Sequence, residues 1–178
     1  MVPIQTFASR DALYAEAAER IAVAIRAGIS GLGEGCAALS GGTTPEPAYA
    51  LLAAKNLDWP KVRFALVDER FVPPDHPASN EAMLRRALRK PLERGARLAP
   101  LYADTTLQNA AAAANAAYAG LTFNIAVMGM GADGHTASWF PGSAQLADAL
   151  DPNTQRVVIS VEAVQAGGAA QRLTLTLP

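Results

Sequence analysis

Three short, largely apolar runs, each followed at once by glycine or charged residues, constrain the fold of this chain most strongly. The runs span residues 36–39, 62–67 and 123–128. Runs of this length that stop at turn-forming residues are typical of strands buried on both faces of a sheet. Helical patterns separate them, and parallel neighbours need such crossovers. The sequence therefore predicts an α/β fold with a mostly parallel, Rossmann-like sheet and flanking helices.

Helices are expected before and between these strands. Ser9 can cap a first helix, which ends in the glycine-rich stretch 28–35. Its apolar positions recur every four residues and are Leu13, Ala17, Ile21 and Ile25. Similar signals predict further helices over 47–54, from Ser79 onward and over the alanine-rich run 110–119. Two more strands are expected over 157–161 and 173–177, with Gly167-Gly168 between them.

The composition fits one globular domain over residues 1–178. The chain is 51% hydrophobic and 17% charged, and no internal repeat or low-complexity linker marks a boundary. The net charge is −1 and no run of Lys or Arg forms a stripe, so neither nucleic acid nor a membrane surface is an expected partner. No pattern in the sequence specifies an oligomeric state.

Cysteine and histidine are scarce. Cys36 is the only cysteine, which excludes an internal disulfide and a cysteine-based zinc site, and the only histidines are His76 and His135. A structural metal is therefore not expected. The first ten residues contain no apolar signal segment, and no stretch approaches the roughly 20 apolar residues that a membrane span needs. We expect a cytoplasmic protein.

The loop Ser40-Gly41-Gly42-Thr43-Thr44-Pro45 lies between the first strand and a helix. Two glycines let backbone N–H groups approach an anion, the hydroxyl side chains can donate hydrogen bonds, and the helix N-terminus favours negative charge. The loop thus suits a phosphate monoester, although a short Gly/Ser loop is also common as a simple tight turn. It lacks the Lys-Ser or Lys-Thr ending of a P-loop.

The triplet Asp68-Glu69-Arg70 ends the second strand, and a proline-rich loop through Pro77 follows it. An isolated charged triplet is usually a solvated strand end. An arginine at the carboxyl end of a buried strand, near a loop suited to phosphate, can instead make bidentate contacts to phosphate or carboxylate. We therefore treat this triplet as a candidate part of a binding site.

The third strand ends in Gly129-Met130-Gly131-Ala132-Asp133-Gly134-His135. Its glycines match G-x-G-x-x-G, which raises a dinucleotide site as an alternative. That site would usually lie in the first βαβ unit, with an acidic residue about 20 positions further on. Here the match comes late, Glu162 is too distant, and Asp133 would crowd the pyrophosphate. The dinucleotide interpretation is disfavoured.

His135 is the best candidate for acid–base chemistry, because an imidazole can act as a free base at cellular pH. Asp133 could hold the other ring nitrogen and select the tautomer. The alternative is a loop histidine that only caps a helix or packs against Trp139. His76, among prolines, is expected to be exposed. All three polar clusters, at 40–45, 68–70 and 129–135, follow strands, so one crevice at the carboxyl ends of a parallel sheet could collect them.

The chain carries several blocks in a fixed order: Ser40 to Pro45, Asp68-Glu69-Arg70, Ser79-Asn80 and the long block 129–142, Gly-Met-Gly-Ala-Asp-Gly-His-Thr-Ala-Ser-Trp-Phe-Pro-Gly. Together they resemble the 6-phosphogluconolactonase family of the glucosamine/galactosamine-6-phosphate isomerase superfamily. Arg172-Leu173-Thr174-Leu175-Thr176 is similar to the late arginine-bearing strand of that family. The resemblance covers nearly the whole chain, and the last block is its most specific part.

The resemblance implies the fold shared by glucosamine-6-phosphate deaminase, ribose-5-phosphate isomerase A and CoA transferases. It implies hydrolysis of 6-phosphoglucono-δ-lactone in the oxidative pentose phosphate pathway, without a cofactor. In this sequence it makes His135 the base that activates water, supported by Asp133. The residues it assigns to substrate or phosphate binding are Ser40, Gly41, Gly42, Thr43, Asp68, Arg70, Gly131 and Arg172.

Two alternatives share these blocks. Glucosamine-6-phosphate deaminases follow the GxGxDGH block with Phe-Asn-Glu-Pro, whereas this chain has Ser138-Trp139-Phe140-Pro141 and so lacks the acid. A sugar-phosphate sensor domain normally carries a DNA-binding module, for which there is no room before Ser9. The chain stops at Pro178, where relatives continue through another helix, a strand and a closing helix, so we expect a C-terminally incomplete or unusually short form.

Overall fold

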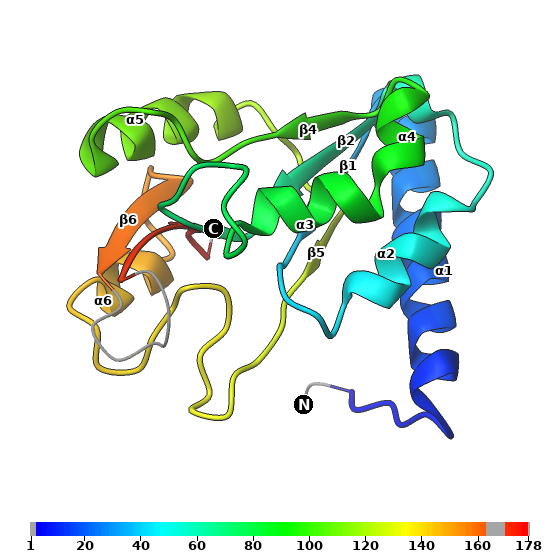
Figure 1. The fold of residues 1–178 in the computed structure, drawn as a ribbon, viewed down its shortest axis with the longest axis horizontal. Coiled ribbons are helices and arrows are strands. Elements are labelled where there is room, and N and C mark those ends of the chain that lie inside the picture. Colours follow the sequence, from blue (N-terminus) through cyan, green and yellow to red (C-terminus); the bar gives the residue numbers. More distant parts are fainter. Residues whose placement is uncertain (1–2, 163–169, 178) are drawn as a thin grey trace.

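The structure of this protein, a computed structural model, describes residues 3–162 and 170–177. Two sheets, one parallel and one antiparallel, lie side by side with helices packed around them (Figure 1). None of the helices in these two ranges is both long and apolar enough to cross a membrane. The predicted glycine turn at Gly167-Gly168 lies outside the described residues.

The parallel sheet confirms the predicted α/β architecture. It contains β1 (Gly35–Leu39), β2 (Val62–Leu66), β4 (Arg97–Ala99) and β5 (Ile125–Val127), in the order β4-β2-β1-β5. Every residue of β1 is buried, as the continuous apolar run predicts for a central strand. The strand β5 is shorter than the predicted run 123–128 and lies at the edge of the sheet.

The first helix, α1 (Arg10–Leu32), begins and ends at the predicted signals. The Ser9 hydroxyl accepts a hydrogen bond from the Ala12 amide at 3.1 Å, and Gly33 closes the helix in the left-handed conformation. The predicted apolar face is only half right, because Leu13 is 40% exposed. A four-residue step drifts by about 40° each time around a helix of 3.6 residues per turn. The buried positions are Ala18, Ile21, Ala22, Ile25 and Gly28.

The remaining helices surround the sheets. The helix α1 packs along β1, and α2 (Glu46–Ala53) packs on α1 and on α3 (Asn80–Ala87). The helix α5 (Leu107–Tyr118) packs against β6 (Val158–Glu162) of the second sheet. The predicted cap of α3 is confirmed, since the Ser79 hydroxyl accepts a hydrogen bond from the Ala82 amide at 3.1 Å. Two short helices, α4 (Arg89–Glu93) and α6 (Leu146–Leu150), and a 3₁₀ turn at Trp59–Lys61 complete the helical elements of the described residues.

The second sheet is antiparallel and contains β3 (Asp68–Arg70), β7 (Gln171–Leu175) and β6 (Val158–Glu162), in the order β3-β7-β6. The expectation that residues 68–70 only terminate a strand is therefore wrong, because they pair with β7 as a strand of their own. Val67 joins the two sheets. Its N–H donates to Leu39 O at 3.1 Å, and its carbonyl accepts from Leu175 N at 2.8 Å.

The Glu69 carboxylate ties β3 to the start of α3. Glu69 is fully buried and accepts hydrogen bonds from the Asn80 amide at 2.8 Å and the Glu81 amide at 2.7 Å. It also accepts from the Arg70 amide at 2.7 Å and the Ser79 hydroxyl at 3.0 Å. Burial raises the pKa of the Glu69 carboxyl, and these donors oppose that rise. A carboxylate at a helix N-terminus satisfies amides that the helix itself leaves unpaired.

Replacing Glu69 by glutamine tests this tie. The amide has one acceptor oxygen, and its NH₂ group would face N–H donors that it cannot satisfy. We expect Glu69→Gln to lower the free energy of unfolding by about 1–3 kcal/mol, the usual cost of leaving buried groups unpaired. Urea denaturation followed by circular dichroism measures the change.

Glu93→Gln is the matched control. Glu93 lies on α4 and pairs with Arg89 at 3.0 Å with both side chains largely exposed, so its loss should stay within about 0.5 kcal/mol. Equal stability of wild type and Glu69→Gln would show that the buried carboxylate does not hold β3 to α3.

Candidate active site

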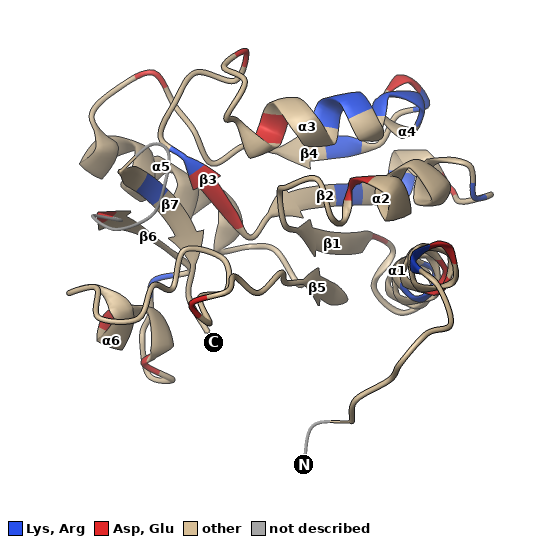
Figure 2. Ribbon diagram, turned by 60° about the horizontal axis from the view of Figure 1, so that its bottom comes forward, with Lys and Arg blue, Asp and Glu red and all other residues tan. Residues whose placement is uncertain are grey.

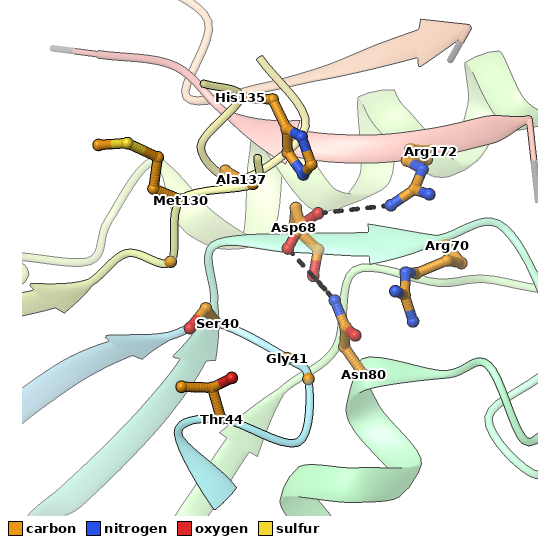
Figure 3. Close-up of a pocket in the computed structure, with 13 residues that line it drawn as sticks. Ser40, Gly41, Thr44, Asp68, Arg70, Asn80, Met130, His135, Ala137 and Arg172 are labelled. Carbon is orange, nitrogen blue, oxygen red and sulfur yellow. Dashed lines mark hydrogen bonds and ion pairs between the residues drawn. The ribbon is translucent and has the colours of Figure 1, made fainter. Parts of the chain in front are cut away.

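One pocket of about 270 Å³ lies where the carboxyl ends of β1 and β5 meet the second sheet (Figure 3). The three polar clusters found in the sequence all contribute to it. The lining residues are Ser40, Gly41, Gly42 and Thr44 after β1, Asp68 and Arg70 on β3, Asn80 on α3, Gly129, Met130, Gly131, His135 and Ala137 after β5, and Arg172 on β7.

Two of the predicted site residues stand apart from this lining. Thr43 does not line the pocket, whereas its neighbour Thr44 does. Asp133 is also absent from the lining, and its carboxylate bonds to His135, which does line the pocket. The structure brings the other predicted residues together around the cavity, although they come from segments more than 100 residues apart.

The loop after β1 is held at its first residue, Ser40. The Ser40 amide donates to Val127 O at 3.1 Å, and the Tyr49 hydroxyl donates to Ser40 O at 3.0 Å. A Cβ on Gly41 would overlap the side chain of Asn80, so only glycine lets the loop come this close to α3. The loop therefore has a fixed position at the floor of the pocket.

Asp68 is a buried carboxylate in the centre of the pocket wall (Figure 3). The Asn80 side-chain amide donates to Asp68 Oδ1 at 3.2 Å, and the Ser138 hydroxyl donates to Oδ2 at 2.7 Å. Arg172 Nη1 lies 4.0 Å from the same Oδ2. Burial raises the pKa of the Asp68 carboxyl, whereas the Ser138 hydrogen bond and then Arg172 and Arg70 lower it.

Arg70 and Arg172 face each other directly across β3 and β7. In Figure 2 the blue, basic segments of β3 and β7 lie next to each other, beside the red, acidic part of β3. Arg70 Nη1 donates to Ala78 O at 2.5 Å, but the Nε atom of each arginine is buried and has no hydrogen-bond partner among the described residues. Burial and the neighbouring Arg70 charge lower the pKa of Arg172. Two unpaired guanidinium donors of like charge form a favourable place for an anion.

The His135 ring points into the pocket above Asp68 (Figure 3). Its Nδ1 atom lies 2.5 Å from Asp133 Oδ1, and this hydrogen bond is the main reason that the pKa of Asp133 lies below its ordinary value. The bond leaves Nε2 as the nitrogen that is available to a ligand. A Cβ on Gly131 would overlap the imidazole, so the glycine at this position makes room for the ring.

Sequence reasoning did not assign roles to Asn80, Ser138 or Ala137. Asn80 and Ser138 lie in the blocks that carry the family resemblance, but a single polar residue gives no signal of its partner across the fold. Ser138 is fully buried, and its bond to Asp68 spans 70 positions. Ala137 has a φ of 48°, which is a strained backbone for a residue with a Cβ, and it turns the chain so that Ser138 faces inward.

The chain is similar to known proteins over most of its length. The family model of glucosamine-6-phosphate isomerases/6-phosphogluconolactonase matches residues 8–178. A 6-phosphogluconolactonase of Rhizobium meliloti is 43% identical over 96% of this chain and 74% of its own length. One of Caulobacter vibrioides is 37% identical over 99% of this chain and 77% of its own length.

Solved structures give the same result. The crystal structure of a 6-phosphogluconolactonase from Shewanella baltica superposes with a TM-score of 0.88 at 34% identity, over 96% of this chain and 72% of that one. The 6-phosphogluconolactonase of Trypanosoma brucei superposes with a TM-score of 0.78 at 27% identity, over 99% of this chain and 76% of that one. The chain belongs to the family of glucosamine-6-phosphate isomerases and 6-phosphogluconolactonases.

Proposed function

We propose that this protein hydrolyses 6-phosphoglucono-δ-lactone to 6-phosphogluconate, a step of the oxidative pentose phosphate pathway, with His135 as the general base. The observation that carries the proposal is the geometry of one pocket. An imidazole that Asp133 orients at 2.5 Å shares the pocket with the buried Arg172 and the half-buried Arg70, whose Nε donors have no partner among the described residues. The similar proteins named 6-phosphogluconolactonase support the choice of substrate.

The chemistry requires one water molecule and no covalent intermediate. His135 Nε2 takes a proton from water while the water oxygen bonds to the lactone carbonyl carbon. The tetrahedral intermediate then collapses, and the bond from this carbon to the ring oxygen breaks. The imidazolium returns its proton to that oxygen, which becomes a hydroxyl, and the new carboxylic acid ionises in solvent. Asp133 stabilises the imidazolium and keeps Nε2 toward the substrate.

The rest of the pocket binds and orients the substrate. Backbone N–H groups of Gly41 and Gly42 suit the phosphate, and the half-buried guanidinium of Arg70 supplies positive charge. Asp68 has lone pairs left for a sugar hydroxyl after its bonds to Asn80 and Ser138. Binding energy from the phosphate end can thereby hold the carbonyl against His135.

The first test is His135→Gln. Loss of the base should lower kcat by about 100- to 10,000-fold, the usual share of general base catalysis. Affinity for the product 6-phosphogluconate should change little, because the loop 40–44 and both arginines remain. Rates need correction for spontaneous lactone hydrolysis, and turnover within a few-fold of wild type would exclude His135 as the base.

The second test separates phosphate binding from ring binding. We expect Arg70→Ala to raise KM at least tenfold for the phosphorylated lactone, and much less for unphosphorylated glucono-δ-lactone. Arg89→Ala is the control, since Arg89 is an exposed arginine on α4 and should leave both values unchanged. Equal losses for the two substrates would assign Arg70 to the lactone ring instead.

The third test concerns the buried charge of Asp68. Burial raises its folded-state pKa, so the wild type loses stability as pH rises from the ordinary carboxyl range, about 4, through that raised pKa. Asp68→Asn carries no charge, so the Tm of the variant relative to that of wild type should rise as pH increases through this interval, while activity falls. Thermal unfolding from pH 4 to 8 measures this. A difference in Tm between the variant and wild type that stays constant from pH 4 to 8 would contradict it.

A further inference from the structure

The aromatic ring of Phe140 is anchored in a small second core. Phe140 is 7% exposed and packs with Ala149 of α6 and with Ile159 and Val161 of β6. Its carbonyl accepts a hydrogen bond from the Ser143 amide at 3.1 Å, which closes the turn that follows. The ring therefore has a fixed position beside the pocket, although it does not line the cavity itself.

Two residues of the pocket contact this one ring. The centroids of the Phe140 and His135 rings are 4.7 Å apart, with 39° between their planes. The guanidinium carbon of Arg172 lies 5.2 Å from the Phe140 centroid, within the range of a cation–π contact. The single aromatic side chain thus touches both the base and one of the two facing arginines.

His135 needs such a contact, because its hydrogen bond alone does not fix the ring. Asp133 holds only Nδ1, and its own side chain is 58% exposed. The imidazole could still turn about the bond to Asp133. Gly131 bounds it with backbone on one side, and the Phe140 ring bounds it on another. Together these contacts restrict the direction of Nε2.

Arg172 has few other favourable contacts. Its Nε is unpaired among the described residues, its nearest carboxylate oxygen is 4.0 Å away, and Arg70 lies directly opposite. The negative face of an aromatic ring attracts a guanidinium that is removed from water. Phe140 therefore retains Arg172 in the pocket despite the repulsion from Arg70.

We propose that Phe140 is a positioning residue of the lactonase site, whose ring orients the His135 imidazole and holds the Arg172 guanidinium at the same time. The proposal rests on the proposed function. It adds Phe140 as the residue that links the base, His135, to the anion-binding Arg172. Phe140 acts through its two neighbours and does not contact the substrate.

The test compares Phe140→Leu with Ile159→Val. Leucine keeps an apolar side chain but loses the flat face, so kcat should fall about 10- to 100-fold and KM should rise several-fold, as expected for small misplacements of catalytic groups. Ile159 belongs to the same small core but has no aromatic ring to pack against His135. Ile159→Val should therefore lower Tm and keep kcat and KM within twofold. Similar losses in both variants, or unchanged kinetics in Phe140→Leu, would overturn the proposal.

A double variant separates positioning from packing. If Phe140 acts on kcat through His135, adding Phe140→Leu to His135→Gln should lower kcat no further, while the rise in KM through Arg172 persists. Independent, multiplicative losses of kcat would contradict a role through His135.

Two measurements do not depend on turnover and so remain valid if the lactonase function fails. In wild type, NMR should show NOEs between the ring protons of Phe140 and His135. Affinity for inorganic phosphate should fall in Phe140→Leu and stay unchanged in Ile159→Val. Absence of the NOEs in the folded protein would overturn the proposal even if Phe140→Leu did not fold, whereas NOEs without lactonase activity would contradict only the proposed function.

Discussion

Burial of the Glu69 carboxylate at the N-terminus of α3 is the interaction on which the geometry of the pocket depends. Side chains alternate between the two faces of a strand, so Asp68 and Arg70 share one face of β3 and Glu69 has the other. Four donors surround the Glu69 carboxylate and satisfy it within the protein. Because a buried carboxylate without donors would be costly, β3 and α3 keep one relative position. Asp68, Arg70 and Asn80 are thereby directed toward the cavity.

The pocket concentrates features that reduce stability elsewhere in a protein. Asp68 is a buried charge, Arg70 faces Arg172, and Ala137 has a left-handed backbone. Such strain persists where the surrounding structure over-determines it, and it is often found at functional sites. Here Glu69, the packed Phe140 ring and the anchored loop after β1 supply that support. An anionic ligand would supply negative charge next to the two arginines.

Features set by near neighbours in the chain could be predicted from the sequence, whereas contacts between distant residues could not. Apolar runs and caps predicted the central strands and α1 well, because these signals depend on near neighbours in the chain. The exposure of Leu13 shows the limit of an inference from a four-residue repeat. The strand β3 was missed because three charged residues do not resemble a strand, and only pairing with β7, about 100 residues later, makes them one. The hydrogen bond from Ser138 to Asp68 was missed for the same reason, because it joins residues 70 positions apart.

The sequence by itself determined the α/β class, the three polar clusters at strand ends and the candidate base His135 with its neighbour Asp133. These follow from periodicity, from glycine loops and from spacings of a few residues, all of which are local. Only the tertiary structure decided that Arg70 faces Arg172, that Asn80 closes on Gly41 and that Phe140 contacts both His135 and Arg172. The physical reason is that strand register and core packing bring distant residues together, and no local pattern encodes which pairs will meet.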